Sequence, residues 1–164
     1  RMSLPEEGSM RNYSMPFNRE GGCLGVNEKL WRVGTTYIPV TNVDQSADWY
    51  VEKLGAELGF IDKDKAIVNL ADQSIFLVKA AENQSLNFID SYGNERFSLT
   101  FEVNGLEALK KLHYDFVQKG IKAGEIEDRG HAGRNFVFED IDGNMFDVWS
   151  ELSIGFKEKH FKKA

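Results

Sequence analysis

Two carboxylates stand on segments in which polar and apolar side chains alternate. Glu102 follows Ser98 and Thr100 at every second position of one such segment, and Asp147 lies between two apolar residues of another. Alternation places these polar side chains on the sheet face opposite the apolar set. Two carboxylates on one wall can act as general acid and base when their surroundings separate their pKa values. The alternatives are that Asp147 pairs with an Arg or Lys or faces water, and that Glu102 is a solvated strand end.

A second group of candidate residues is basic or aromatic. His131 and Arg134 lie in a glycine-flanked loop that enters the last predicted hairpin, and such loops often carry binding residues. Tyr37, Trp149 and Trp31 can line a pocket that accepts planar or cationic ligands by stacking and cation–π contact. The alternatives are that the two loop residues are solvated and that the aromatic side chains fill a core or a dimer seam.

The elements that position these residues form a repeat. A strand, a helix and further strands occur twice about sixty residues apart, which makes this unit the building block of the core. The expected elements are strand 34–40, helix 44–54 and strands 66–70 and 74–79, then strand 97–103, helix 106–119 and strands 136–139 and 145–150. Leu30 is expected to begin the first regular strand. Each helix is expected to stop at a glycine, Gly55 and Gly120.

The repeat divides the chain into four parts. Residues 1–29 are a vector-derived leader and an N-terminal arm, 30–95 the first module and a linker, 96–151 the second module, and 152–164 a tail with a terminal helix. The segment Asp140–Asn144 predicts a tight hairpin connection in which Gly143 or Asn144 has a positive φ. A calcium loop is not expected there, because the glycine falls at the fourth position and not the sixth.

Composition limits the class of protein. With 164 residues and 41% hydrophobic residues, the chain can bury a sizeable core. The formal charge of −6 disfavours nucleic acid and mildly favours a cationic or neutral ligand. No run has the length of a membrane span, no stretch has the pattern of a signal peptide, and the single cysteine, Cys23, fits a reducing compartment. We therefore expect a soluble, cytoplasmic protein without membrane or nucleic-acid partners.

Two motifs resemble the vicinal-oxygen-chelate superfamily, which includes glyoxalase I, extradiol dioxygenases and bleomycin-resistance proteins. The segment 40–55, Val-Thr-Asn-Val-Asp-Gln-Ser-Ala-Asp-Trp-Tyr-Val-Glu-Lys-Leu-Gly, is similar to the entry signature of the superfamily, and 133–144 resembles its final hairpin, with Ile141 where proline is usual. The resemblance implies an α+β fold of two βαβββ modules whose curled mixed sheets surround a cavity, commonly within a homodimer.

The same resemblance implies where a metal would bind. Metalloenzymes of the superfamily take one ligand near the start of each module's first strand and one carboxylate late in each module. The first-strand positions are occupied by Thr35 and Ser98 in this chain, and the late position of the first module falls at Phe76 or Leu77. Only Asp147 keeps an acid at its late position. Neutral hydroxyls are poor ligands beside imidazole or carboxylate, so no metal and no other cofactor is predicted.

These observations favour a small-molecule binding protein of the bleomycin-resistance type, which sequesters a cationic or aromatic organic ligand as an antibiotic-resistance protein does, and forms a homodimer. The predicted ligand-binding residues are Asp147, Glu102, Tyr37, Trp149, Thr35, Ser98, His131 and Arg134. Whether the chain is an enzyme stays open. The alternative is a lyase, isomerase or dioxygenase of the same superfamily, which uses Asp147 or Glu102 as base or holds a metal through unusual ligands such as His131.

Overall fold

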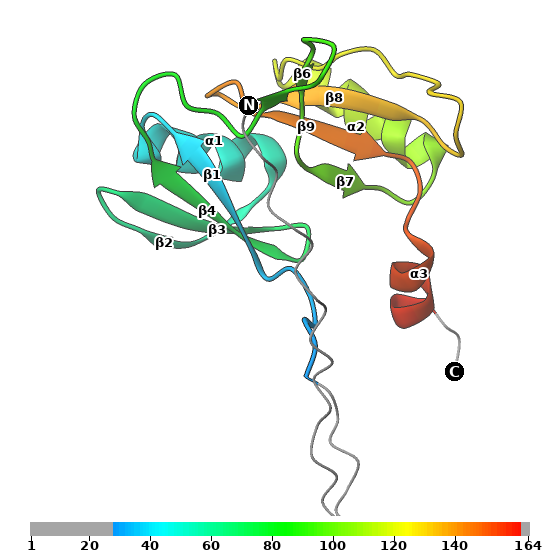
Figure 1. Ribbon diagram of the computed structural model, residues 1–164, viewed down its shortest axis with the longest axis horizontal. Helices are drawn as coiled ribbons and strands as arrows, with labels where there is room; N and C mark the ends of the chain where they lie inside the picture. Colours follow the sequence, from blue (N-terminus) through cyan, green and yellow to red (C-terminus); the bar gives the residue numbers. More distant parts are fainter. Residues whose placement is uncertain (1–27, 162–164) are drawn as a thin grey trace, which may run out of the picture. The chain divides into compact units, whose positions relative to one another are not determined.

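The computed structural model describes residues 28–161, and Figure 1 shows the path of the chain. The predicted leader, most of the arm and Cys23 lie outside these residues. The chain divides into two compact units, Arg1–Trp31 and Arg32–Ala164, and the helices and strands of the described residues all lie in the second. The fold is α+β, with helices packed on curled mixed sheets. No helix in the described part of the chain is long and apolar enough to cross a membrane.

The first module has the expected βαβββ order. Its elements are β1 (Thr35–Val40), α1 (Val43–Leu54), β2 (Glu57–Ile61), β3 (Lys65–Leu70) and β4 (Gln73–Lys79). The strands lie in the order β1-β4-β3-β2, with β1 parallel to β4 and the other pairs antiparallel. Ile38 pairs with Leu77 on the buried face that carries α1, and Tyr37 pairs with Phe76 on the opposite face.

Helix α1 is set by the residues at its two ends. The Asn42 side chain accepts a hydrogen bond from the Gln45 backbone N–H at 3.0 Å, which satisfies one of the free donors of the first turn. The helix stops at Gly55, whose φ of 72° is a left-handed conformation that glycine adopts without strain, as the sequence predicted. Between these ends, Ala47 and Tyr50 are buried against the sheet.

The second module is a shorter version of the first. It contains β7 (Thr100–Glu102), α2 (Leu106–Gln118), β8 (Asn135–Glu139) and β9 (Met145–Trp149), in the sheet order β7-β9-β8. The resemblance implied a fourth strand, between α2 and β8. In its place, two isolated antiparallel bridges, Ala123 to Phe138 and Glu127 to Asn135, attach the chain after α2 to β8.

Some boundaries differ from the sequence prediction. The first strand begins at Thr35 and not at Leu30, and β7 covers three residues in place of 97–103. Ser98 lies outside β7, and its hydroxyl donates a hydrogen bond to the Leu86 carbonyl at 2.8 Å, which ties this segment to the linker. The sequence did not predict β2 or the small hairpin of β5 (Phe88–Ile89) and β6 (Glu95–Arg96). The tail carries the expected helix, α3 (Ile154–His160).

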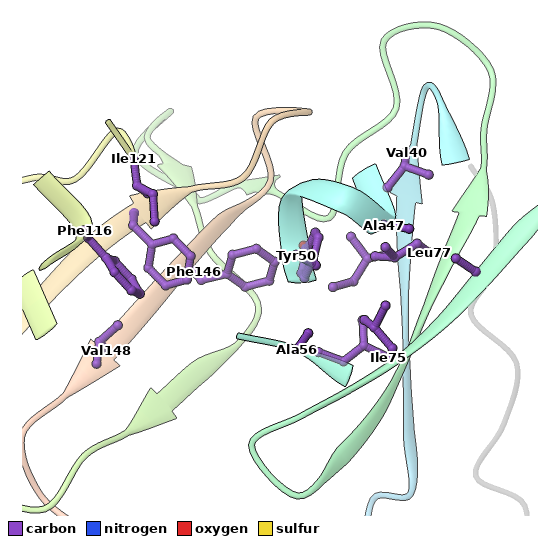
Figure 2. Close-up of a cluster of buried hydrophobic side chains, with 14 of the residues drawn as sticks. Val40, Ala47, Tyr50, Ala56, Ile75, Leu77, Phe116, Ile121, Phe146 and Val148 are labelled. Atoms are coloured by element: carbon purple, nitrogen blue, oxygen red, sulfur yellow. The ribbon is translucent and has the colours of Figure 1, made fainter. Parts of the chain in front are cut away.

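One hydrophobic core joins the two modules. It contains the helix-bearing face of each sheet, and Figure 2 shows Tyr50 of α1 between the two sets of side chains. Its largest fully buried side chains include Tyr50, Phe136, Phe146, Ile38, Ile75, Leu77 and Leu109. Because both sheets contribute their helix-bearing faces to this core, their helix-free faces are turned away from it.

Polar contacts at the turn between β8 and β9 also join the modules. Asp140 is buried and accepts a hydrogen bond from the Tyr50 hydroxyl of α1 at 2.7 Å. Asn144 is fully buried, donates to the Pro39 carbonyl of β1 at 3.0 Å and accepts from the Leu86 backbone N–H at 2.8 Å. Gly143 supplies the positive φ, at 82°, that the sequence predicted for this turn.

Burial shifts the pKa values of Asp140 and Tyr50, which form the contact between the two modules. Desolvation raises the pKa of Asp140 above its ordinary value of 3.8, although hydrogen bonds from Asn144, Tyr50 and the turn backbone act in the opposite direction. Desolvation, with the neighbouring Asp140 charge second, raises the pKa of Tyr50 well above 10.0. The tyrosine is therefore a permanent donor to Asp140 near neutral pH.

Candidate functional site

Asp147 lies on the helix-free face of β9 and is surrounded by donors. Its carboxylate accepts hydrogen bonds from Asn135 Nδ2 at 2.8 Å and from Thr100 Oγ1 at 3.1 Å. Arg129 Nη1 lies 3.1 Å from its other oxygen and forms an ion pair in which the Asp147 side chain is 4% exposed and the Arg129 side chain 26%. Asp147 therefore forms an ion pair with an arginine, which was one of the alternatives considered from the sequence. Two neutral side chains also donate hydrogen bonds to it.

Arg129 is held in place by further contacts. Its Nε donates to Glu127 at 2.8 Å, and its guanidinium carbon lies 5.5 Å from the centre of the Phe97 ring. The guanidinium thus sits between two carboxylates and an aromatic ring. A carboxylate paired in this way is a weaker metal ligand than a free one, because the positive charge of the guanidinium repels a cation.

The positions that correspond to metal ligands do not form a metal site in this chain. The Ser98 hydroxyl donates to the Leu86 carbonyl, Thr35 lies on the first sheet, and Asp147 on the second is neutralised by Arg129. Within residues 28–161, no group of three or more His, Cys, Asp or Glu side chains is placed to hold a metal ion. The donors at these positions therefore do not fit a divalent transition metal.

The loop before β8 contacts Trp149. The indole Nε1 donates to the Ala132 carbonyl at 2.8 Å, and the His131 ring lies edge-on to the indole with 6.1 Å between ring centres. Arg134 pairs with Asp128 at 3.0 Å on the same loop. Three of the predicted site residues, Trp149, His131 and Arg134, are thus gathered at one end of the second sheet, beside the Asp147 cluster.

Tyr37 lies on the helix-free face of the first sheet. Its ring is 5.1 Å from the ring of Phe76 at a tilt of 53°, and its side chain is 62% exposed. Thr35 lies two residues earlier on the same face of β1. The late position of the first module is thus filled by an aromatic ring, Phe76, that extends the surface formed by Tyr37. The predicted site residues therefore occupy two separate surfaces of a single chain.

Glu102 is placed differently from the other predicted residues. Its carboxylate accepts hydrogen bonds from the Ser153 backbone N–H at 2.9 Å and from the Ser153 hydroxyl, so it fastens the start of α3 to β7. It also lines a cleft of about 620 Å³ between the turn from β3 to β4, β7 and α3. Glu102 and Asp147 have separate partners, and the structure gives no direct contact that would couple them as an acid and base.

Sequence reasoning missed Arg129 and Asn135, the strongest partners of Asp147. The contact of Asn135 could have been predicted from the sequence. It is a polar residue two positions before Val137, which pairs directly with Asp147, so both lie on the same face of the sheet as Asp147. Arg129 had no such signal. It lies on an irregular segment, and neither periodicity nor spacing predicts which carboxylate such a residue will reach.

Comparisons with known proteins agree on a single family. The sequence family described as Glyoxalase/Bleomycin resistance protein/Dioxygenase superfamily matches residues 32–148. The fosfomycin resistance protein FosX of Listeria monocytogenes is 13% identical, with 76% of this chain and 96% of that chain covered and a TM-score of 0.61. The lactoylglutathione lyase of Agrobacterium tumefaciens is 14% identical, with 75% and 96% covered and a TM-score of 0.59.

A third solved structure is described as an antibiotic binding protein. It is TnmS3 of Streptomyces sp. CB03234, which is 19% identical, with 76% of this chain and 99% of that chain covered and a TM-score of 0.56. No curated protein sequence matches this chain. At these identities the likeness of the solved structures concerns the fold alone.

Proposed function

We propose that this chain, which belongs to the Glyoxalase/Bleomycin resistance protein/Dioxygenase superfamily, is a small-molecule binding protein that sequesters an organic ligand without a metal. The ligand is cationic or aromatic, and the site lies on the helix-free faces of the two sheets. We further propose a cytoplasmic location, for which the single cysteine of the sequence is the support.

The observation that carries this proposal is the pairing of Asp147 with Arg129. Asp147 is the one acid at the positions where metalloenzymes of the superfamily bind their ion, and a guanidinium lies 3.1 Å from it. Thr100 and Asn135 both donate to its second oxygen. A side chain held in this way fixes the shape of a binding surface, and the neighbouring guanidinium disfavours a metal cation beside it.

The helix-free faces carry aromatic and hydroxyl side chains that can bind a ligand. Tyr37 and Phe76 form a tilted aromatic pair on the first sheet, and Trp149 lies with His131 on the second. Stacking and cation–π contacts with such rings suit planar or cationic molecules. The net charge of −6 favours a cation for the same reason that it disfavours a polyanion.

A second copy of the chain would bring the two surfaces together. Tyr37 and Trp149 lie on sheet faces that both turn away from the shared core, so they do not converge within one chain. The first of these faces exposes Tyr37, and β2 at its edge exposes Leu58, Phe60 and Ile61. We therefore propose a homodimer in which the first sheet of one copy faces the second sheet of the other and the ligand lies between them.

The test combines oligomeric state, metal content and ligand binding. The purified protein is expected to sediment as a dimer, to contain no stoichiometric zinc, nickel, iron or manganese, and to gain thermal stability with planar aromatic cations that carry no amino group, such as N-methylacridinium. Tyr37→Ala should abolish that gain, whereas Tyr114→Ala, which removes a tyrosine of equal exposure from α2, should leave it intact. Stoichiometric metal, or a thermal shift that persists in Tyr37→Ala, would contradict the proposal.

A further inference from the structure

The cleft between the two modules has the size and lining of a ligand site. Its volume of about 620 Å³ lies within the usual range of small-molecule pockets, roughly 300–1,000 Å³. Apolar side chains form most of the wall, among them Ile75 of β4, Leu99 and Phe101 beside and on β7, and Leu152 and Phe156 on the side of α3. Ile75, Leu99 and Phe101 lie on the helix-bearing side of the sheets, whereas Thr100 and Glu102, which also line the cleft, lie on the helix-free side of the edge strand β7. The cleft is therefore at this sheet edge, and its lining does not include Tyr37, Trp149 or His131.

The polar groups of the cleft are acceptors. Glu102 supplies a carboxylate, Asp72 a second one, and Gln73 an amide. Among the described residues that line the cleft there is no Lys, Arg or His. The wall therefore carries negative charge with no cation of its own, and a cationic group entering it would gain electrostatic free energy.

Gln73 gives a second and independent indication. Within residues 28–161, its Oε1 atom is buried and has no hydrogen-bond partner. A buried acceptor without a donor costs free energy, and a donor from a bound molecule would remove this cost. Gln73 is held in this position by a tight turn, because Ala71 and Asp72, with φ values of 50° and 59°, form the two-residue hairpin connection between the paired residues Leu70 and Gln73.

Helix α3 forms one wall of the cleft and is fastened through the same carboxylate. The Ser153 backbone N–H and hydroxyl, at the start of α3, both donate to Glu102. This contact fixes the carboxylate beside the apolar wall that Leu152 and Phe156 supply. The arrangement presents one fixed negative group next to an apolar surface, which matches a molecule with one positive end and an apolar body.

We propose that this cleft is a second ligand site, which binds organic amines that carry an apolar body and a protonated amino group. The ammonium group lies at the carboxylate of Glu102 and donates to Gln73 Oε1, and the apolar body packs against the wall between β7 and α3. This site does not depend on a dimer or on Tyr37, Trp149 and His131, which do not line the cleft.

Dansylcadaverine, an aromatic fluorophore with a primary amine, is a suitable probe. With the full chain, its emission should shift to the blue and saturate at one probe for each cleft, whereas dansylglycine, which carries a carboxylate on the same fluorophore, should bind at least tenfold more weakly. Glu102→Gln and Gln73→Leu should each weaken the amine by roughly tenfold, the factor expected for a lost hydrogen bond in which one partner is charged. Glu107→Gln removes the same charge from an exposed position on α2 and should change nothing.

Two further variants separate this site from the helix-free faces. Leu152→Trp fills the cleft, keeps every polar group and should abolish probe binding even if Glu102→Gln loosens α3. Tyr37→Ala should leave probe binding unchanged. Binding that survives Gln73→Leu and Leu152→Trp overturns the inference. Binding that is lost in Tyr37→Ala also overturns it, and places the amine on the helix-free face while leaving the proposed function intact.

Discussion

We expect loss of the Tyr50 hydroxyl to lower the free energy of unfolding, because its hydrogen bond to Asp140 links the two modules. Tyr50 lies on α1 of the first module and is fully buried, and Asp140 lies in the turn between β8 and β9 of the second. The 2.7 Å hydrogen bond between them crosses from one module to the other. Tyr50→Phe removes this donor while it keeps the ring that packs between the two sets of core side chains.

The expected loss follows from the charge of the acceptor. A hydrogen bond to a charged group contributes about 1.5–3 kcal/mol, against about 0.5–1.5 kcal/mol for a neutral pair. After the substitution, Asp140 Oδ2 still accepts from Asn144 Nδ2 at 2.9 Å, so the carboxylate is not left without a partner. We therefore expect a loss of about 2 kcal/mol at neutral pH. For a protein of this size that loss corresponds to a fall in Tm of roughly 4–8 °C.

The loss should depend on pH in a direction set by Asp140. Burial raises the pKa of this carboxyl above 3.8, so its contribution to stability is fully present below pH 3.8 and is lost as the pH rises through the folded-state pKa. The Tyr50 hydrogen bond opposes that shift, and its removal raises the pKa of Asp140 further. The free-energy loss in Tyr50→Phe should therefore be larger at neutral pH than below pH 3.8, where the acceptor is neutral.

Urea unfolding of both proteins at neutral pH and below pH 3.8 measures this difference directly. Tyr114→Phe is the matched control, because Tyr114 is exposed on α2, and its stability should stay within about 0.5 kcal/mol of the parent. A loss that is equal at the two pH values would refute the assignment of a charged acceptor. A loss below about 0.5 kcal/mol would refute the hydrogen bond itself.

Further predictions concern the candidate site. Arg129→Ala should lower the free energy of unfolding by about 1.5–3 kcal/mol in urea, because it leaves the buried Asp147 charge without its ion pair; Arg134→Ala, which breaks a more exposed pair, should cost less than about 1 kcal/mol. Gly143→Ala should cost about 1–2 kcal/mol for its positive φ alone. Gly133→Ala should cost roughly 1–3 kcal/mol more and change the tryptophan emission, because its new Cβ would lie 2.7 Å from the Trp149 indole nitrogen; equal losses for the two glycine variants would contradict that crowding.

The sequence correctly predicted the helices and strands that are determined by local patterns, such as the spacing of apolar residues and the position of a glycine. Helix α1 was placed correctly to within a residue, because apolar positions recur at helical spacing and Gly55 supplies the left-handed end. Strand β2 was missed because all of its residues are exposed and a register shift between Leu58 and Phe60 interrupts its pairing with β3. Strand β7 was predicted too long because its residues alternate from 97 to 103, whereas its pairing with β9 covers only Thr100–Glu102, and pairing is a tertiary property.

The sequence predicted which residues lie at the candidate site, but it did not predict which hydrogen bonds and ion pairs they form. Alternation correctly placed Asp147 on the helix-free face of its strand, since that is a property of the local backbone. Its ion pair with Arg129 depends on the path of an irregular segment eighteen positions away, which no local pattern encodes. The role of Glu102 at α3 was missed for the same reason, because Ser153 lies in a tail whose docking is a tertiary property.

The motif that identifies the family has mainly a structural role in this chain. Asp140 and Asn144, which carry much of the resemblance in 133–144, use their side chains to bind Tyr50, Pro39 and Leu86 and so to hold the modules together. Because these side chains hold the modules together whatever the protein binds, the motif indicates the fold and leaves the chemistry open. The chemistry must be read from residues outside the motif. In this chain those residues pair the remaining acid with a guanidinium, and the binding function that we propose rests on this pair.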